Sequence, residues 1–190
     1  MTDHHPQRAL IFLTGFMGSG KSTLGPILAN TLGYDFVDVD RMIEQKSGKS
    51  ISEVFQELGE EKFRQMERDA LHEVVGMRDA VVSLGGGAIA NEENFQLVHA
   101  YGFIVYLRMS PEEATRRMRH KVNRPLLKGA EGEMLDEEAL RKKITDLMKK
   151  REQFYTRADV IIETERQRIG TTVDDLVKLL RVQMTRRSNP

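Results

Sequence analysis

The 190-residue sequence contains no cysteine. The protein can therefore form no disulfide bond, use no thiolate nucleophile and hold no metal through sulfur. The sequence also lacks any apolar run close to the roughly 20 residues that a membrane-spanning helix needs. Residues 1–8 are polar and lack the apolar middle of a secretion signal. These absences lead us to expect a cytoplasmic protein with no membrane partner.

A net charge is absent as well. Lysine and arginine together number 29, as do aspartate and glutamate, so the formal net charge is +0. No global field then favours nucleic acid, and we expect no nucleic-acid partner. The length suits one domain with its own core, spanning residues 1–190. We expect a monomer with disordered tails at residues 1–8 and 183–190.

Five short segments are rich in β-branched or aromatic residues, and most are continuous apolar runs, as is typical of strands covered on both faces. They are Ala9–Leu13, Asp35–Val39, Ala80–Leu84, Phe103–Leu107 and Val160–Ile162. Segments with helical periodicity separate them, and Ser110-Pro111-Glu112-Glu113 has the pattern of a capping box at a helix start. Alternating strands and helices predict an α/β fold with a parallel sheet between helical layers.

Residues Gly15 to Ser22 spell a complete phosphate-binding loop, G-x-x-x-x-G-K-[ST]. The loop lies between an apolar run and a helical segment, which is the context that the motif requires. Its glycines let backbone N–H groups approach phosphates, Lys21 can reach the β- and γ-phosphates, and the Ser22 hydroxyl can bind Mg²⁺. A glycine-rich turn that binds nothing is the alternative. The absence of a guanine-reading N/T-K-x-D tetrapeptide argues against a GTPase.

Asp38-Val39-Asp40 follows the second apolar run. If the segment stays extended, both carboxylates point to one side of the strand, at the edge where parallel sheets bind ligands. One carboxylate near Mg²⁺ and one near an acceptor hydroxyl would suit phosphoryl transfer to an alcohol. A capped helix start before Arg41 explains the same spacing.

Gly85-Gly86-Gly87 follows the third apolar run, and Arg64 lies three residues before Glu67. Three consecutive glycines suggest that another group approaches the backbone closely, although a sharp turn would also need them. Arg64 and Glu67 share one face of a helix. A solvent-exposed surface pair is the ordinary explanation for that spacing.

Residues 119–136 include two glycines and a proline in a polar context, which predicts a mobile segment. Arg124 lies inside it. An arginine in a flexible segment of a phosphate-handling protein favours a closing lid over an ordinary surface loop.

Taken together, these motifs resemble shikimate kinase over Ile11 to Ile162. The resemblance rests on the phosphate loop with Thr23 and Gly25, Asp38-Val39-Asp40, Phe63-Arg64-x-x-Glu67, Gly85-Gly86-Gly87, Arg124-Pro125-Leu126-Leu127 and Arg151-x-x-Phe154-Tyr155. It implies a three-layer P-loop kinase fold with a five-stranded parallel sheet. It also implies a lid and a substrate-binding subdomain at about residues 38–70.

The implied reaction transfers the γ-phosphoryl group of ATP to the 3-hydroxyl of shikimate, in the route to chorismate and the aromatic amino acids, with Mg²⁺ as cofactor. By this resemblance ATP contacts Gly18, Ser19, Gly20, Lys21, Ser22, Thr23, Arg117 and Arg124, of which Arg117 lies against the adenine. Shikimate contacts Asp40, Arg64, Gly85, Gly86, Gly87 and Arg151. Ser22 and Asp38 hold the metal, Lys21, Asp40 and Arg124 are catalytic, and Glu67 orients Arg64.

Two other functions stay open on the sequence. A kinase for another polyol acid, such as gluconate, would also need an arginine for a carboxylate and an aspartate for a hydroxyl. A non-catalytic nucleotide sensor could keep the fold without the chemistry. The presence of Lys21, Asp38, Asp40 and Arg124 together argues against the sensor.

Overall fold

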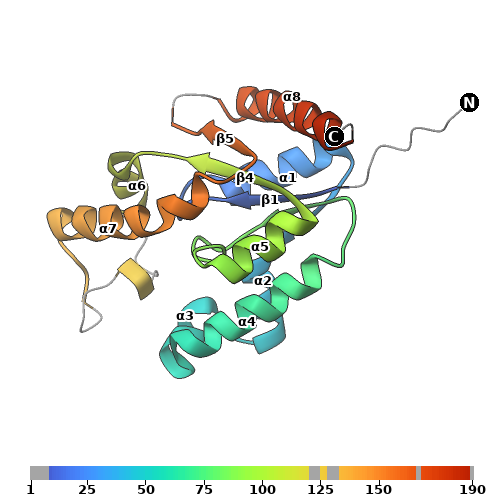
Figure 1. Cartoon of the computed structure of the whole chain (residues 1–190). Helices are drawn as coiled ribbons and strands as arrows, with labels where there is room; N and C mark the ends of the chain where they lie inside the picture. Colours follow the sequence, from blue (N-terminus) through green and yellow to red (C-terminus); the bar gives the residue numbers. More distant parts are fainter. Residues whose placement is uncertain (1–8, 120–124, 128–132, 166–167, 189–190) are drawn as a thin grey trace, which may run out of the picture.

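The computed structural model describes residues 9–119, 125–127, 133–165 and 168–188. Within them, five parallel strands form one sheet in the order β2-β3-β1-β4-β5 (Figure 1). The strands are β1 (Leu10–Thr14), β2 (Asp35–Asp38), β3 (Ala80–Ser83), β4 (Gly102–Arg108) and β5 (Val160–Glu163). All five segments that the sequence predicted as strands are confirmed, with ends that differ by at most one residue.

Helices connect the strands and cover the sheet. They are α1 (Lys21–Leu32), α2 (Val39–Ser47), α3 (Ile51–Glu57), α4 (Gly59–Val74), α5 (Glu92–Tyr101), α6 (Pro111–Met118), α7 (Glu137–Tyr155) and α8 (Ile169–Ser188), with a 3₁₀ turn η1 at Pro125–Leu127. Sequence reasoning did not anticipate α5 as a separate element. Its start is marked locally, because the Asn91 side chain accepts a hydrogen bond from the Asn94 backbone N–H at 2.9 Å.

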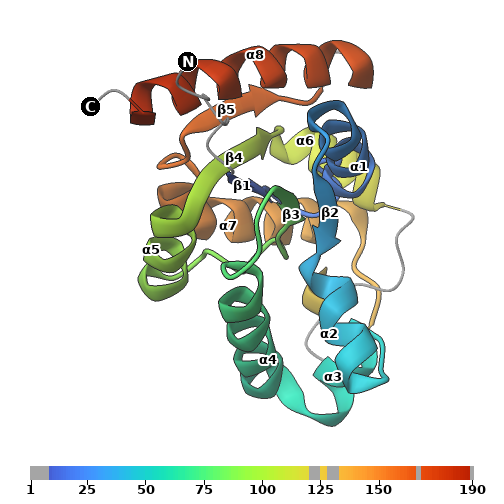
Figure 2. The same cartoon turned by 90° about the vertical axis from the view of Figure 1, so that its right-hand side faces the viewer.

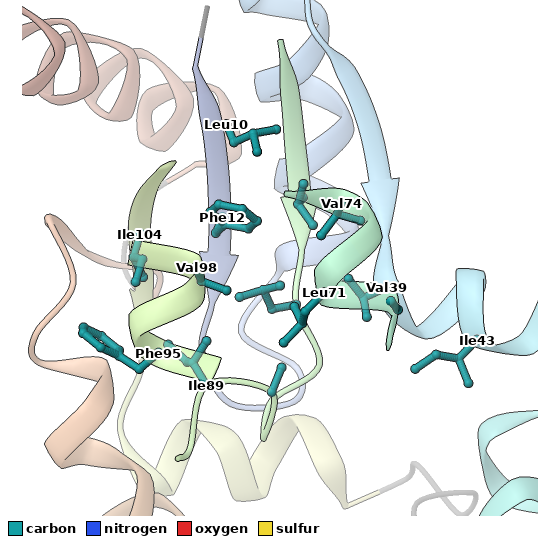
Figure 3. Close-up of a cluster of buried hydrophobic side chains, with 14 of the residues drawn as sticks. Leu10, Phe12, Val39, Ile43, Leu71, Val74, Ile89, Phe95, Val98 and Ile104 are labelled. Atoms are coloured by element: carbon teal, nitrogen blue, oxygen red, sulfur yellow. The ribbon is translucent and has the colours of Figure 1, made fainter. Parts of the chain in front are cut away.

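The central strand β1 is buried on both faces, and its side chains alternate between two layers. Leu10 and Phe12 point to the face covered by α4 and α5, where they belong to one buried cluster with Leu71 and Val98 (Figure 3). Ile11 and Leu13 point to the opposite face, where the apolar sides of α1 and α8 cover them. The protein therefore has three layers, with the sheet in the middle.

The chain order reverses at β1, since β3 lies on one side of it and β4 on the other. In open parallel sheets ligands bind at the carboxyl ends of the strands beside such a switch point. The chain leaves β1, β2 and β3 at this edge, through a loop after β1 and β3 and directly into α2 after β2 (Figure 2). Helices α2 and α3 and the start of α4 extend beyond the same edge of the sheet, in the region expected to bind substrate.

Of the two alternatives left open for Asp38 and Asp40, the extended strand is wrong. Strand β2 ends at Asp38, whose side chain caps α2 by accepting a hydrogen bond from the Arg41 N–H at 3.2 Å. Asp40 lies in the first turn of that helix. The alternative of a capped helix start is the correct one.

Two further expectations need correction or lie outside the described residues. A disordered tail from residue 183 is wrong, because α8 continues to Ser188. Residues 1–8, 189 and 190 lie outside the described residues, as do most of the expected lid and its Arg124. Of the lid, η1 is described, and its Leu127 is buried against a cluster formed by α6 and α7.

Candidate active site

The phosphate loop has the backbone that the motif predicts. Gly15, Gly18 and Gly20 have φ angles of 139°, 82° and 102°, a region that side chains other than glycine rarely enter. Gly20 is the N-cap of α1, so the loop leads directly into the positive end of a helix dipole. The Lys21 Nζ donates to the carbonyl oxygens of Gly15 at 2.7 Å and Phe16 at 3.2 Å, which holds the amine over the loop.

A pocket of about 450 Å³ opens at this edge of the sheet. Nearly every predicted site residue lines it: Gly18, Gly20, Lys21, Ser22, Thr23, Asp38, Asp40, Arg64, Glu67, Gly85, Gly86, Gly87, Arg117 and Arg151. Of the remaining predicted residues, Ser19 is buried within the phosphate loop, and Arg124 is outside the described part of the chain. The fold thus brings residues from β2, from the helices α1, α2, α4, α6 and α7, and from two loops to one pocket.

Arg64 and Glu67 form an ion pair at this pocket, in which the glutamate is buried and the arginine is partly exposed. An Nη of Arg64 donates to Oε2 of Glu67 at 2.8 Å, and the other Nη reaches Glu60 at 3.1 Å. The Glu67 side chain is only 1% exposed. Burial raises the pKa of Glu67 and nearby Asp40 adds to the rise, while Arg64 opposes it. The reading of Arg64 and Glu67 as a solvated surface pair is therefore wrong.

The three glycines after β3 allow charged side chains to approach the backbone. A Cβ on Gly85 would lie 3.0 Å from carboxylate oxygens of both Asp40 and Glu67, and a Cβ on Gly87 would lie 2.9 Å from an Nη of Arg64. A Cβ on Gly86 would lie 3.2 Å from Nη1 of Arg151. None of the three has a positive φ, so close approach requires glycine here, although the segment also turns.

Arg151 enters the pocket from α7 with its guanidinium carbon 5.7 Å from the centre of the Phe16 ring. Its side chain is almost wholly buried, yet Nη1 has no hydrogen-bond partner among the described residues. Oε1 of Glu67 is also buried and has no hydrogen-bond partner among the described residues. A buried polar group without a partner costs about 1–3 kcal/mol, so both atoms favour a polar ligand that would satisfy them.

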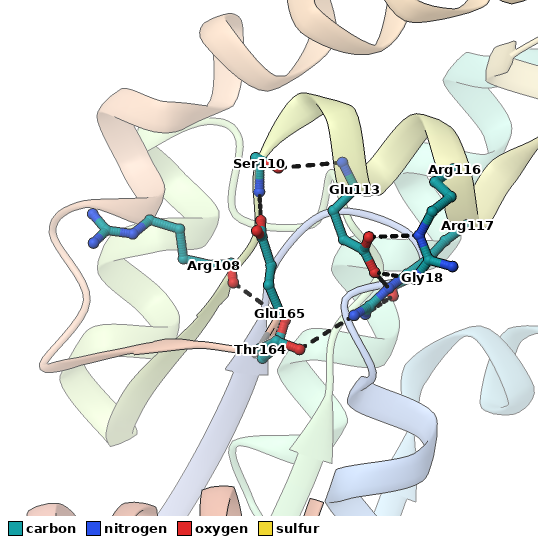
Figure 4. A network of polar contacts seen from close by, with 8 residues as sticks. All are labelled: Gly18, Arg108, Ser110, Glu113, Arg116, Arg117, Thr164 and Glu165. Atoms are coloured by element: carbon teal, nitrogen blue, oxygen red, sulfur yellow. Dashed lines mark hydrogen bonds and ion pairs between the residues drawn. The ribbon is translucent and has the colours of Figure 1, made fainter. Parts of the chain in front are cut away.

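Arg117 of α6 connects three parts of the nucleotide side (Figure 4). Its Nε donates to Glu113 at 2.5 Å, one Nη donates to the Gly18 carbonyl at 2.8 Å, and the other Nη to the Thr164 carbonyl at 3.2 Å. The arginine thereby links the phosphate loop to the segment that follows β5. Arg117 lines the pocket, and its contact with adenine stays a prediction.

The capping box expected at the start of α6 forms only in part. The Ser110 hydroxyl accepts from the Glu113 N–H at 3.2 Å. The Ser110 N–H donates to Glu165 rather than to Glu113, whose carboxylate instead binds Arg116 and Arg117. A residue 55 positions away completes the cap, which no local pattern could indicate.

Sequence reasoning missed the apolar wall of the pocket. Ile51 and Phe55 of α3 line it together with Phe63, and the Phe55 and Phe63 rings lie 4.6 Å apart. Phe55 belonged to an apolar stripe at helical spacing, which is usual for a core residue. The sequence carried no signal that one end of this stripe would face a ligand.

The sheet order, the phosphate loop on the central strand and the convergence of arginines and carboxylates beside it define a P-loop phosphotransferase. Comparisons with known proteins narrow the class. A family model for shikimate kinase matches residues 17–181. A curated shikimate kinase from Chlorobium phaeobacteroides (strain BS1) is 51% identical over 174 residues, which cover 92% of this chain and 86% of the relative. This chain belongs to the shikimate kinase family.

Solved structures agree in fold. A shikimate kinase from Acinetobacter baumannii, solved in complex with shikimate, has a TM-score of 0.84 at 32% identity and covers 94% of this chain and 96% of its own. A gluconokinase from Sinorhizobium meliloti 1021 has a TM-score of 0.56 at 18% identity, over 92% of this chain and 93% of its own. The second likeness shows the shared fold alone.

Among the helices of the described ranges, none combines the length and the apolar character needed to cross a membrane.

Proposed function

We propose that this chain transfers the γ-phosphoryl group of ATP to the 3-hydroxyl of shikimate, giving shikimate 3-phosphate and ADP. The observation that carries this proposal is one pocket in which a phosphate loop faces Asp40 and two arginines. Membership of the shikimate kinase family supports the same reaction. The reaction belongs to the route to chorismate and the aromatic amino acids.

On the nucleotide side, the backbone amides of residues 18–23 would hold the ATP phosphates at the N-terminus of α1. Lys21 already lies over the loop, where its ammonium group would meet the β- and γ-phosphates. Arg117 would lie beside the base. Arg124 would neutralise charge on the transferring phosphoryl group when the lid at residues 119–136 closes and excludes water.

The donor set of the pocket fits a magnesium ion. Ser22 and Asp38 line the pocket beside Lys21 and offer a hydroxyl and a carboxylate, the oxygen ligands that Mg²⁺ prefers. The remaining ligands would be phosphate oxygens and water, as is usual for this ion in nucleotide sites. When bound, Mg²⁺ supplies charge neutralisation at the β- and γ-phosphates.

On the acceptor side, Arg64 and Arg151 would bind the carboxylate of shikimate. A guanidinium can meet a carboxylate through two parallel hydrogen bonds, and the unpaired Nη1 of Arg151 has a donor to offer. Glu67 holds Arg64 from the buried side, and the backbone of residues 85–87 lies between the arginines. Residues 38–70 would thus form the substrate-binding subdomain.

Asp40 would bind the acceptor hydroxyl and take its proton as the new O–P bond forms. Asp40 lies in the first turn of α2, and its carboxylate lines the same pocket as the phosphate loop, close to Gly85. Orientation of the hydroxyl toward the γ-phosphate supplies most of the catalysis in such transfers, since little covalent chemistry is left for the protein.

The main test is the release of ADP with Mg-ATP in the presence and absence of shikimate. We expect turnover that depends on shikimate, and we expect Asp40→Asn and Arg64→Ala each to lose at least about 100-fold in kcat/KM, as is common for removed catalytic groups. A matched change on the same helix, Arg68→Ala, removes an arginine that does not line the pocket and should keep parental kinetics. Absence of shikimate-dependent turnover in the parental protein would overturn the proposal.

Gluconate is the second substrate to compare, since the gluconokinase shares the fold. A higher kcat/KM for gluconate than for shikimate would identify gluconate as the substrate instead. ATP binding without transfer to either acceptor would instead favour a nucleotide sensor. We further propose that the chain binds no nucleic acid, because its charges balance. We also propose that it is a cytoplasmic monomer.

A further inference from the structure

Tyr155 is the last residue of α7 and lies one helical turn after Arg151. Its side chain is 1% exposed, and its hydroxyl donates a hydrogen bond to the carbonyl oxygen of Gly86. The two residues are 69 positions apart, so this bond connects the end of α7 to the glycine segment after β3. None of the roles described above uses the Tyr155 hydroxyl.

We infer that Tyr155 is a positioning residue for the acceptor site, whose hydroxyl holds the Gly86–Gly87 peptide in place between Arg151 and Arg64. This inference rests on the function proposed above. It adds a residue that would touch neither substrate and would act through the backbone of the glycine segment.

The need for such a hold follows from the glycines themselves. Glycine has more backbone freedom than any other residue, and residues 85–87 have no side chains to pack. A Cβ on Gly86 would lie 3.2 Å from Nη1 of Arg151, and a Cβ on Gly87 would lie 2.9 Å from Nη1 of Arg64. Both arginines keep these close positions only if the glycine backbone keeps one conformation. A bond from a rigid, buried ring supplies that constraint.

The bond also fixes the orientation of the next amide. A peptide unit is planar, so anchoring the Gly86 C=O sets the direction of the Gly87 N–H at the opposite end of the same plane. Both residues line the pocket. Without the hydrogen bond from Tyr155, the peptide between Gly86 and Gly87 could rotate. The guanidinium groups of Arg64 and Arg151 would then no longer pack against a fixed backbone.

The hydroxyl is suited to act as a donor. Burial raises the pKa of Tyr155 to about 12, although Arg151 opposes the rise, so the phenol keeps its proton at neutral pH. The ring is held by Tyr106, whose centroid lies 4.8 Å away. The Tyr106 hydroxyl instead donates to Glu152 at 3.1 Å.

The neighbouring tyrosines provide a matched pair of variants, Tyr155→Phe and Tyr106→Phe. Each change removes one hydroxyl from a buried ring and leaves the ring in place. For Tyr155→Phe we expect the KM for shikimate to rise by about 5- to 10-fold, the size expected for one lost hydrogen bond. We expect its KM for ATP to stay within twofold, and both KM values of Tyr106→Phe to stay within twofold.

Thermal unfolding of both variants separates positioning from folding. Three kinetic outcomes would each overturn the inference. Tyr155→Phe could leave the KM for shikimate unchanged, or it could raise the KM for ATP as well as that for shikimate. Tyr106→Phe could raise the KM for shikimate as much as Tyr155→Phe does. Failure of Tyr155→Phe alone to fold would also overturn it, because the hydroxyl would then serve the core. An inactive parental protein would instead reject the proposed function, so the two failures are distinguishable.

Discussion

At positions 85–87 the lack of side chains allows four charged groups to approach the backbone. Arg64, Arg151 and the carboxylates of Asp40 and Glu67 all occupy space that a Cβ would need. A methyl group here would therefore act on the charged side chain beside it rather than on the backbone, because none of these glycines has a positive φ.

The change Gly87→Ala tests this directly. The new methyl carbon would lie 2.9 Å from Arg64 Nη1, and the guanidinium must shift away from it. We expect about a tenfold loss in kcat/KM for shikimate, equivalent to about 1.4 kcal/mol, with the KM for ATP unchanged.

The matched control is Gly170→Ala in α8. Among the described residues, nothing lies within 4 Å of a Cβ at Gly170, so kinetics should be parental and thermal stability equal or slightly higher. Equal kinetic losses in both variants would contradict the steric argument.

Protonation of Glu67 should lower the activity of the protein as the pH falls. Burial raises its pKa above the ordinary glutamate value, and Asp40 adds to the rise. As the pH falls, Glu67 then takes up its proton at a less acidic pH than an exposed glutamate would, and it ceases to be a charged acceptor for Arg64. We expect kcat/KM for shikimate to decline over that range.

Kinetics between pH 4.5 and 8 check this expectation with two variants. In Glu67→Gln the midpoint of the acid decline should move, since the titrating group is gone. In Glu60→Gln, which removes the exposed partner of the same arginine, the midpoint should stay where it is in the parental protein. A midpoint that is the same in all three proteins would exclude Glu67 as the titrating group.

At the scale of secondary structure, helical spacing explains how one helix can place two cooperating side chains at the pocket. Arg64 and Glu67 are three residues apart on α4, and Arg151 and Tyr155 are four residues apart on α7. Both spacings put the two side chains on one helix face. Each helix therefore carries an arginine for the pocket together with the group that orients the arginine or its surroundings.

Helix α6 should serve the nucleotide in a similar way. Hydrogen bonds from Arg116 hold the pKa of Glu113 at about 2, and Arg117 contributes, while partial burial opposes the shift. Glu113 therefore stays charged and keeps Arg117 directed at the phosphate loop. We expect Glu113→Gln to raise the KM for ATP about three- to tenfold without changing the KM for shikimate, because one charged hydrogen bond weakens.

Glu112→Gln is the matched control for that prediction. Glu112 lies in the same first turn of α6 but is exposed, so the change has a similar effect on the helix dipole and spares Arg117. An equal effect of both variants on the KM for ATP would show that helix charge, and not the position of Arg117, is responsible.

At the scale of the whole molecule, the sheet separates a stabilising layer from the site. The face covered by α1 and α8 is packed with aliphatic side chains such as Leu176, which is fully buried. The pocket lies at the carboxyl edge, and its acceptor side is formed by elements that pack on the opposite face. Stability and acceptor binding should therefore respond to different substitutions.

Leu176→Ala should lower the free energy of unfolding by about 2–5 kcal/mol, the usual cost of a cavity in a core. Both KM values should remain parental wherever the protein is folded. Leu179→Ala, on the exposed side of the same helix, should change stability by less than about 0.5 kcal/mol. Urea unfolding and steady-state kinetics check both, and a large shift in the shikimate KM of Leu176→Ala would contradict the separation.

Much of this architecture was predictable from local patterns. The five strands follow from apolar runs, and the phosphate loop follows from a motif whose glycines have the positive φ angles that it requires. Most candidate residues also converge on the pocket as expected. Local patterns failed where two local solutions compete, as at Asp38, where an extended strand and a helix cap fit equally well.

The sequence by itself determined the elements, the phosphate loop and the kinds of side chain available for the site, because periodicity and backbone preferences act over a few residues. Tertiary structure alone decided which of these groups meet. The bonds from Arg117 to Gly18 and from Tyr155 to Gly86 span 99 and 69 residues. The burial of Glu67 likewise depends on how the layers pack, since desolvation is a property of the surroundings and not of the residue.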